Sequence, residues 1–179
     1  LTESEKPKFS ENLSVWIRGN LFIPDARRFW IKPSVKFLNK YLSENPVDAM
    51  VSTGPPHSMH MIALKLKEKL GIPWLADFRD PWTNIDFYDD LKLTRVADRI
   101  HRKDEKQVLK SADEVSVISS GMARDFKSIH ARDYAVITNG FDPEDFNKLS
   151  GTELDKDFTI SHIGTMVKTR NPETLWKTI

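Results

Sequence analysis

The chain has 179 residues, 39% hydrophobic residues and a net charge of +1, which suits one globular domain, or one domain with part of another. It has no cysteine, so disulfides and thiolate metal sites are excluded within these residues. The near-neutral charge argues against nucleic acid as a partner, and no apolar run reaches the roughly 20 residues of a membrane span.

Short apolar runs alternate with amphipathic segments along most of the chain. In chain order, the predicted elements are a helix over residues 33–42, a strand over 47–52, a helix over 58–70, a strand over 73–78, a helix over 91–110, a strand over 114–118, a helix capped by residue 119 or 120, and a strand over 134–137. Pro33 is expected in the first turn of the helix over 33–42, and Gly71 is expected to end the helix over 58–70.

This alternation favours right-handed βαβ units and therefore an α/β fold with a doubly wound, Rossmann-like parallel sheet. Residues 1–145 are predicted to form part of a first domain, followed by a linker over 146–157 that is rich in polar residues. Residues 158–163 predict a further strand and Pro172 the start of a helix, so 158–179 would begin a second domain.

Several short motifs occur in the order and spacing of one known family. They are Ser-Thr-Gly-Pro-Pro-His-Ser over 52–58, Asp-Phe-Arg-Asp-Pro-Trp over 77–82, Thr-Asn-Gly-Phe-Asp over 138–142, and His-Ile-Gly-Thr over 162–165 followed by Arg-Asn-Pro over 170–172. With them the chain resembles the glycosyltransferases of family four, which have the GT-B fold. The motif over 77–82 resembles that of bacterial members that build cell-surface polysaccharides.

The resemblance implies two Rossmann-like domains that face each other across a cleft. The first would receive a glycan or lipid-linked acceptor, and the second would bind a nucleotide sugar as donor. Transfer would retain the anomeric configuration and need no metal or other cofactor, in the cytoplasm or at the inner face of its membrane. The family's first strand with its Gly-rich loop, and the Glu-x7-Glu motif of its donor domain, have no counterpart here, so the chain alone is expected to transfer no sugar.

The catalytic candidates are Asp77, Arg79 and Asp80, which lie at the end of a predicted strand. In doubly wound sheets ligands meet the loops at the carboxyl ends of the strands. Two carboxylates there could orient an acceptor hydroxyl and help its deprotonation, whereas an arginine stays protonated and would act electrostatically. The alternative is a local ion pair that pins the loop, with Pro81 and Trp82 packed beneath it.

The acceptor-binding candidates are Gly54, His57, Ser58 and Trp82. The first three lead into a predicted helix, whose free N–H groups and dipole favour an anion. The alternative is a rigid turn in which Ser58 caps the helix. His57 and His60 are too few ligands for a metal site, and His57 is expected to face the cleft.

The donor-binding candidates are Asn139, Gly164, Thr165, Lys168 and Arg170. The resemblance places the first loop of the second domain against the donor's diphosphate. Cations suit that place because the leaving nucleoside diphosphate gains negative charge during transfer. The alternative is a solvated turn, because basic loop residues are usually surface charges.

Two segments suit a peripheral membrane contact. Basic residues dominate 95–110, and aromatic and basic residues mix over 16–30, as in segments that rest on anionic lipid. The alternatives are a solvated helix with pairs such as Asp98–Arg102 and ordinary core packing of the aromatics.

Two other functions remain open from the sequence. One is a glycan-binding module without catalysis, because doubly wound folds carry many functions. The other is a GT-B enzyme that epimerises a nucleotide sugar. A nicotinamide dehydrogenase is disfavoured, because no Gly-x-Gly-x-x-Gly follows a predicted strand.

Overall fold

The computed structural model describes residues 9–147, 153, 155–166 and 171–178. The chain divides into two compact units, Leu1–Asn139 and Gly140–Ile179, and each is described by itself below. None of the helices in the described ranges is long and apolar enough to cross a membrane.

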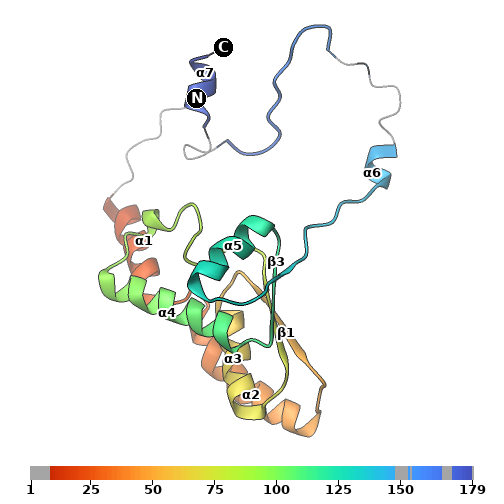
Figure 1. Ribbon diagram of the computed structural model, residues 1–179. Coiled ribbons are helices and arrows are strands. Elements are labelled where there is room, and N and C mark those ends of the chain that lie inside the picture. Colours follow the sequence, from red (N-terminus) through yellow and green to blue (C-terminus); the bar gives the residue numbers. More distant parts are fainter. Residues whose placement is uncertain (1–8, 148–152, 154, 167–170, 179) are drawn as a thin grey trace. The chain divides into compact units, whose positions relative to one another are not determined.

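Helices and strands alternate through the first unit (Figure 1). Its elements are α1 (Phe9–Leu21), α2 (Arg28–Glu44), β1 (Met50–Gly54), α3 (Ser58–Leu70), β2 (Trp74–Phe78), the 3-10 helix η1 (Asp89–Leu91), α4 (Arg95–Ser111), β3 (Glu114–Val117), α5 (Ser120–Ile129) and β4 (Ala135–Val136). Each helix and strand predicted up to residue 137 is therefore present, with ends that shift by a few residues.

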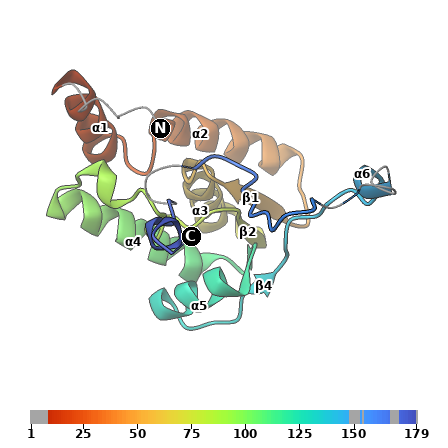
Figure 2. The same ribbon diagram turned by 90° about the horizontal axis from the view of Figure 1, so that it is seen from above.

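The strands form one parallel sheet in the order β1-β2-β3-β4. Because every crossover steps to the next strand in the same direction, right-handed connections place their helices on one face. Figure 2 shows α2, α3, α4 and α5 gathered on one side of the strands. The predicted α/β class and Rossmann-like parallel sheet are confirmed. The helices of this unit cover one face of that sheet.

The two faces of the sheet differ in burial as this arrangement requires. On the helix-covered face, Trp74, Ala76 and Phe78 of β2 are buried and join the main core. On the other face, Val51 of β1 is 67% exposed and its neighbour Leu75 is only partly buried. The core therefore lies between the sheet and a single helix layer.

Local signals explain several element ends. Gly71 adopts a left-handed conformation with φ of 70° and ends α3, as expected where a side chain would be strained. The Ser119 hydroxyl accepts the Met122 N–H and caps α5. The Thr94 hydroxyl caps α4 in the same way, which explains why that helix begins four residues later than predicted.

Helix α2 corrects the expected place of Pro33. The helix begins at Arg28, so Pro33 lies inside it and not in its first turn. The early start is supported by the loop before it, because the Arg28 N–H donates to the Asp25 carbonyl and the Trp30 N–H to the Arg27 carbonyl. Pro33 removes one N–H from the helix ladder, and the helix continues through it.

The second unit contains the short helices α6 (Glu144–Asn147) and α7 (Glu173–Trp176). The start of a helix after Pro172 is confirmed by α7. The strand predicted over residues 158–163 is wrong, because these residues are irregular and the described part of this unit offers no strand to pair with them. The division into a linker over 146–157 and a donor domain from 158 stays a prediction.

The contrast between the two faces of the sheet gives a first test. Val115 is fully buried on the covered face, whereas Val51 lies on the open face. Truncating Val115 to alanine removes buried methyl groups and leaves a cavity, so V115A should lower the free energy of unfolding by about 2 kcal/mol. The matched V51A should change it by less than about 0.5 kcal/mol. Urea unfolding measures both, and equal losses would contradict the one-sided core.

Candidate functional site

A cavity of about 290 Å³ lies beside the carboxyl ends of β1 and β2, where ligands of parallel α/β sheets are usually bound. Aromatic and aliphatic side chains form most of its wall: Phe22, Trp82, Ile85, Phe87, Tyr88 and Leu91. Its polar groups are Arg18, Asp25, His57, Asp80 and His101. The cavity thus combines an apolar wall with a few polar groups, as small-molecule sites do.

Trp82 lies at the centre of this wall. Its indole stacks on the His57 ring, with centroids 4.6 Å apart and planes 1° from parallel. Its N–H donates to Nδ1 of His101 at 3.1 Å. Nδ1 is thus the acceptor, so Nε2 of the neutral His101 ring carries the proton, and it faces the Gly19 carbonyl at 3.4 Å.

Burial governs the charge of the histidines. Loss of hydration lowers the pKa of His57 to about 4, although the carboxylate of Asp25 acts in the opposite direction. Burial also lowers the pKa of His101 and brings that of His60 to about 3. All three rings are therefore neutral near pH 7, and the charged side chains that line the cavity are Arg18 and the carboxylates of Asp25 and Asp80.

Asp25, which the sequence analysis did not select, holds the start of α3. One carboxylate oxygen accepts the Ser58 N–H at 2.7 Å, and the other accepts the Arg27 N–H at 2.8 Å. The helix N-terminus therefore meets an anion that belongs to the chain itself. Ser58 is buried and is the first helical residue, so the alternative in which its hydroxyl caps α3 is wrong.

A buried carboxylate of α4 holds the loop after β2. Glu105 of α4 is 1% exposed and accepts both the N–H of Thr83, at 3.2 Å, and its hydroxyl, at 2.5 Å. Burial raises the pKa of Glu105, and the hydrogen bonds from Thr83 oppose that rise. These bonds fix the backbone immediately after Trp82, and so they position the cavity wall.

The structure separates the three residues predicted as catalytic. Asp77 accepts hydrogen bonds from the hydroxyls of Thr53, at 2.9 Å, and Ser116, at 2.7 Å, and thereby links β2 to both neighbouring strands. The Arg79 guanidinium donates to the side-chain oxygen of Asn139. Of the three residues, Asp80 is the one that lines the cavity.

Of the predicted acceptor residues, His57 and Trp82 line the cavity, whereas Ser58 is buried at the start of α3 and Gly54 packs against histidines. A Cβ placed on Gly54 would lie 2.5 Å from Nε2 of His60. His60 is fully buried, with Nδ1 2.8 Å from the Ser52 hydroxyl oxygen. Across the described ranges, no three side chains able to hold a metal gather in one place.

The predicted donor residues fall in different parts of the chain. Asn139 belongs to the first unit and accepts the bond from Arg79. Gly164, with φ of 136°, and Thr165 lie in the irregular part of the second unit. Lys168 and Arg170 are outside the described residues.

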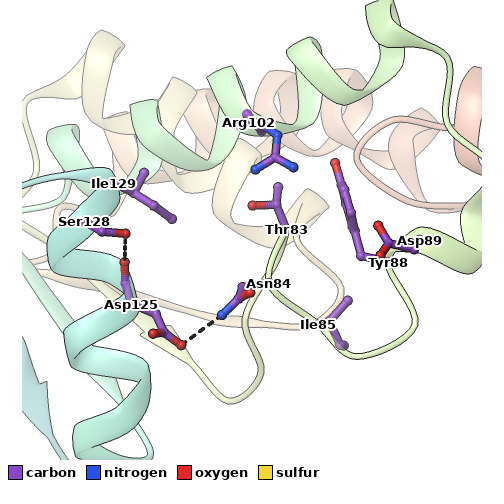
Figure 3. A pocket seen from close by; sticks show the side chains of 9 residues that line it. All are labelled: Thr83, Asn84, Ile85, Tyr88, Asp89, Arg102, Asp125, Ser128 and Ile129. Atoms are coloured by element: carbon purple, nitrogen blue, oxygen red, sulfur yellow. Dashed lines mark hydrogen bonds between the residues drawn. The ribbon is translucent and has the colours of Figure 1, made fainter. Parts of the chain in front are cut away.

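A second cavity of about 420 Å³ lies on the other side of the loop 83–89, between α4 and α5 (Figure 3). Asn84 donates to the carboxylate of Asp125 at 2.9 Å and ties the loop to α5. Ile85 and Tyr88 line both cavities. This loop is thus the partition between the two cavities, and its contacts with α4 and α5 hold it in place.

The basic segment over 95–110 forms α4, and the expected pair is present. Nε of Arg102 donates to the Asp98 carboxylate at 2.9 Å, and the same carboxylate accepts the Tyr88 hydroxyl at 3.0 Å. The Asp98–Arg102 pair that was predicted for a solvated helix is therefore confirmed.

Comparison with known proteins adds one positive finding. The model of the family described as Glycosyltransferase Family 4 matches residues 1–145, the part of the chain that contains the sheet and both cavities. No curated protein and no solved structure matches the chain.

The lowered pKa of His57 predicts a loss of stability in weak acid. Between about pH 6.5 and pH 4 the unfolded chain binds a proton at this residue and the folded chain does not, so the free energy of unfolding falls as the pH is lowered through this window. His57 alone contributes about 3 kcal/mol to that fall. H57F should reduce the pH dependence by this amount in urea unfolding. Glu105 is present in both proteins, so its contribution cancels in the comparison with the parent, and an unchanged pH dependence would contradict the buried neutral ring.

The close approach of Gly54 to His60 predicts a second effect. G54A should destabilise the fold by about 1–3 kcal/mol, because the added methyl group overlaps a fully buried ring. Gly121 in α5 is the matched control, since the nearest atom to its added Cβ is 3.7 Å away. G121A should be neutral or slightly stabilising. Equal melting temperatures for G54A and G121A in thermal unfolding would contradict the packing described for Gly54.

Proposed function

The chain belongs to Glycosyltransferase Family 4, and from this premise we propose that it forms the acceptor side of a retaining glycosyltransferase. The enzyme would transfer a sugar from a nucleotide sugar to a cell-surface polysaccharide or to a lipid-linked glycan. Membership of the family already implies a sugar donor and an acceptor in general terms. The proposal adds the class of each and the way in which the acceptor is bound.

The observation that carries the proposal is the cavity beside the ends of β1 and β2. Aromatic rings next to a few polar groups suit a sugar, whose ring has apolar C–H faces and a polar rim of hydroxyls. The neutral histidines leave two carboxylates and Arg18 as the charged groups of the wall. Hydroxyl groups can donate hydrogen bonds to both carboxylates, which favours a glycan over a bare phosphate in this cavity.

Within this site we assign the role of base to Asp80. A general base must reach the proton that it removes, and Asp80 is exposed at the cavity wall. Asp77 already accepts two hydroxyl hydrogen bonds within the sheet, which suits a residue that positions the loop. Arg79 would also position the loop, through its hydrogen bond to the side chain of Asn139. Gly164 and Thr165 would meet the donor's diphosphate, with no metal or other cofactor required.

The test is acceptor binding by the 179-residue chain. Saturation-transfer difference NMR with a panel of oligosaccharides and short-chain lipid-linked glycans should give signals from the sugar protons. D80N should weaken binding of the best ligand about tenfold, the effect of losing one hydrogen bond to a charged group. D90N is the matched control, because Asp90 is also exposed and lines neither cavity. Its affinity should equal that of the parent.

Two results would overturn the proposal. One is the absence of binding across the whole panel while the chain is folded by circular dichroism. The other is an equal affinity for the parent, D80N and D90N, since the ligand would then lie elsewhere. Incubation with nucleotide sugars and a bound acceptor should yield no transfer, and turnover by this chain alone would show that it does more than receive the acceptor.

A further inference from the structure

Helix α2 has apolar side chains on two opposite faces. The inward face carries Ile31, Val35, Leu38 and Leu42, which belong to the small core that α2 shares with α3. This spacing of three and four residues is that of one buried helical stripe. The inward face therefore accounts for the packing of α2 on the rest of the fold.

The outward face carries a second apolar row at steps of four residues: Phe29, Pro33, Phe37 and Tyr41. Phe29 is 68% exposed, Phe37 67% and Tyr41 50%. Phe37 and Tyr41 stack on each other, with ring centroids 6.0 Å apart. Trp30, which is 57% exposed, lies next to this row at the start of the helix. These residues are called the aromatic row below, and they lie on the side away from the core.

A row of basic residues runs beside the aromatic row, one position earlier in each step: Arg28, Lys32, Lys36 and Lys40. All are exposed, and Glu44 is the one acidic residue of the helix. Like charges four residues apart on a helix repel each other and destabilise it. The row is thus complementary to an anionic partner, which would relieve the repulsion.

The nature of that partner follows from the two rows together. A second copy of the chain is disfavoured, because its own basic row would face the first. A fully buried protein interface is also disfavoured, since lysine is depleted in interface cores. Aromatic residues at the level of lipid headgroups, with lysines that reach the phosphates, are typical of helices that lie in a membrane surface. We infer that the outward face of α2 docks the protein on an anionic lipid bilayer, with the helix parallel to the membrane plane.

This inference is independent of acceptor binding at the cavity, and it assigns the membrane contact to α2 instead of α4. Helix α4 also has a basic surface, lined by Arg95, Arg99, Lys103 and Lys106. Its exposed apolar residues are Val96 and Ile100, and its sequence contains no Phe, Tyr or Trp. Helix α4 therefore has the charge but lacks the rings, and it provides a matched control for α2.

The experiment is flotation of the 179-residue chain with vesicles of phosphatidylglycerol and phosphatidylcholine, and with phosphatidylcholine vesicles as the neutral comparison. The chain should bind the anionic vesicles and be released as salt is raised. K36E/K40E should bind at least about tenfold more weakly, given the contribution of each basic residue near such a surface. F37S/Y41S should also bind more weakly at the same charge. K103E/K106E in α4 should bind within about twofold of the parent, since its charges would lie away from the membrane.

The outcomes separate the alternatives. Equal binding to neutral vesicles, or a larger loss in the α4 variant than in K36E/K40E, would overturn the assignment to α2. A dimer in light scattering that F37S/Y41S abolishes would show that a second copy covers the face. Circular dichroism checks that each variant is folded. Binding of soluble acceptors by NMR should be the same in all α2 variants, so failure of the membrane assignment can be told apart from failure of the acceptor site.

Discussion

The indole of Trp82 lies between two buried imidazoles, and through it three distant segments are fixed with respect to each other. His57 stacks on it from the turn after β1, and His101 of α4 accepts its N–H. His101 in turn reaches the carbonyl of Gly19 in α1. The loop itself is held at the next residue by Glu105. Because buried polar groups are costly unless they are paired, the hydrogen bonds of Trp82 and Thr83 favour this one arrangement of the cavity wall.

The direction of the chain through the sheet explains where this wall can form. Four parallel strands in sequential order send the crossover helices α3, α4 and α5 to one face and bring the loops after β1 and β2 to one edge. The opposite face keeps Asp77 and its hydroxyl partners, which join the three strands β1, β2 and β3 by side chains as well as by backbone. The Asp77 carboxylate is stable on this face because hydroxyl groups within the sheet donate hydrogen bonds to it. The two carboxylates at the end of β2 therefore have different roles: Asp77, within the strand, holds the sheet together, and Asp80, after it, lines the cavity.

Local signals were enough to predict most of the fold, and long-range contacts were needed for the rest. The apolar period of α3 and its end at Gly71 lie within one stretch of sequence, so both were predictable. The strand over 158–163 failed because an apolar run forms a strand only where another strand pairs with it. Asp25 could not be selected, because its partner Ser58 is 33 residues away. The burial of His101 and Glu105 could have been predicted from their spacing, since they share the buried side of α4 with Ala97 and Val108. Their polarity suggested a solvated surface instead.

In helix α2 the choice of residues that would best stabilise the helix differs from the choice that the sequence makes. Its basic row is a form of local frustration, since alternating charges at the same positions would suit an isolated helix better. Natural sequences tend to retain disagreement of this kind where function, and not folding, sets the choice of residue. Optimising the helix for thermal resistance would therefore replace the lysines that give the outward face its specificity. Stability and activity are thus opposed on this surface, and selection for one would erode the other.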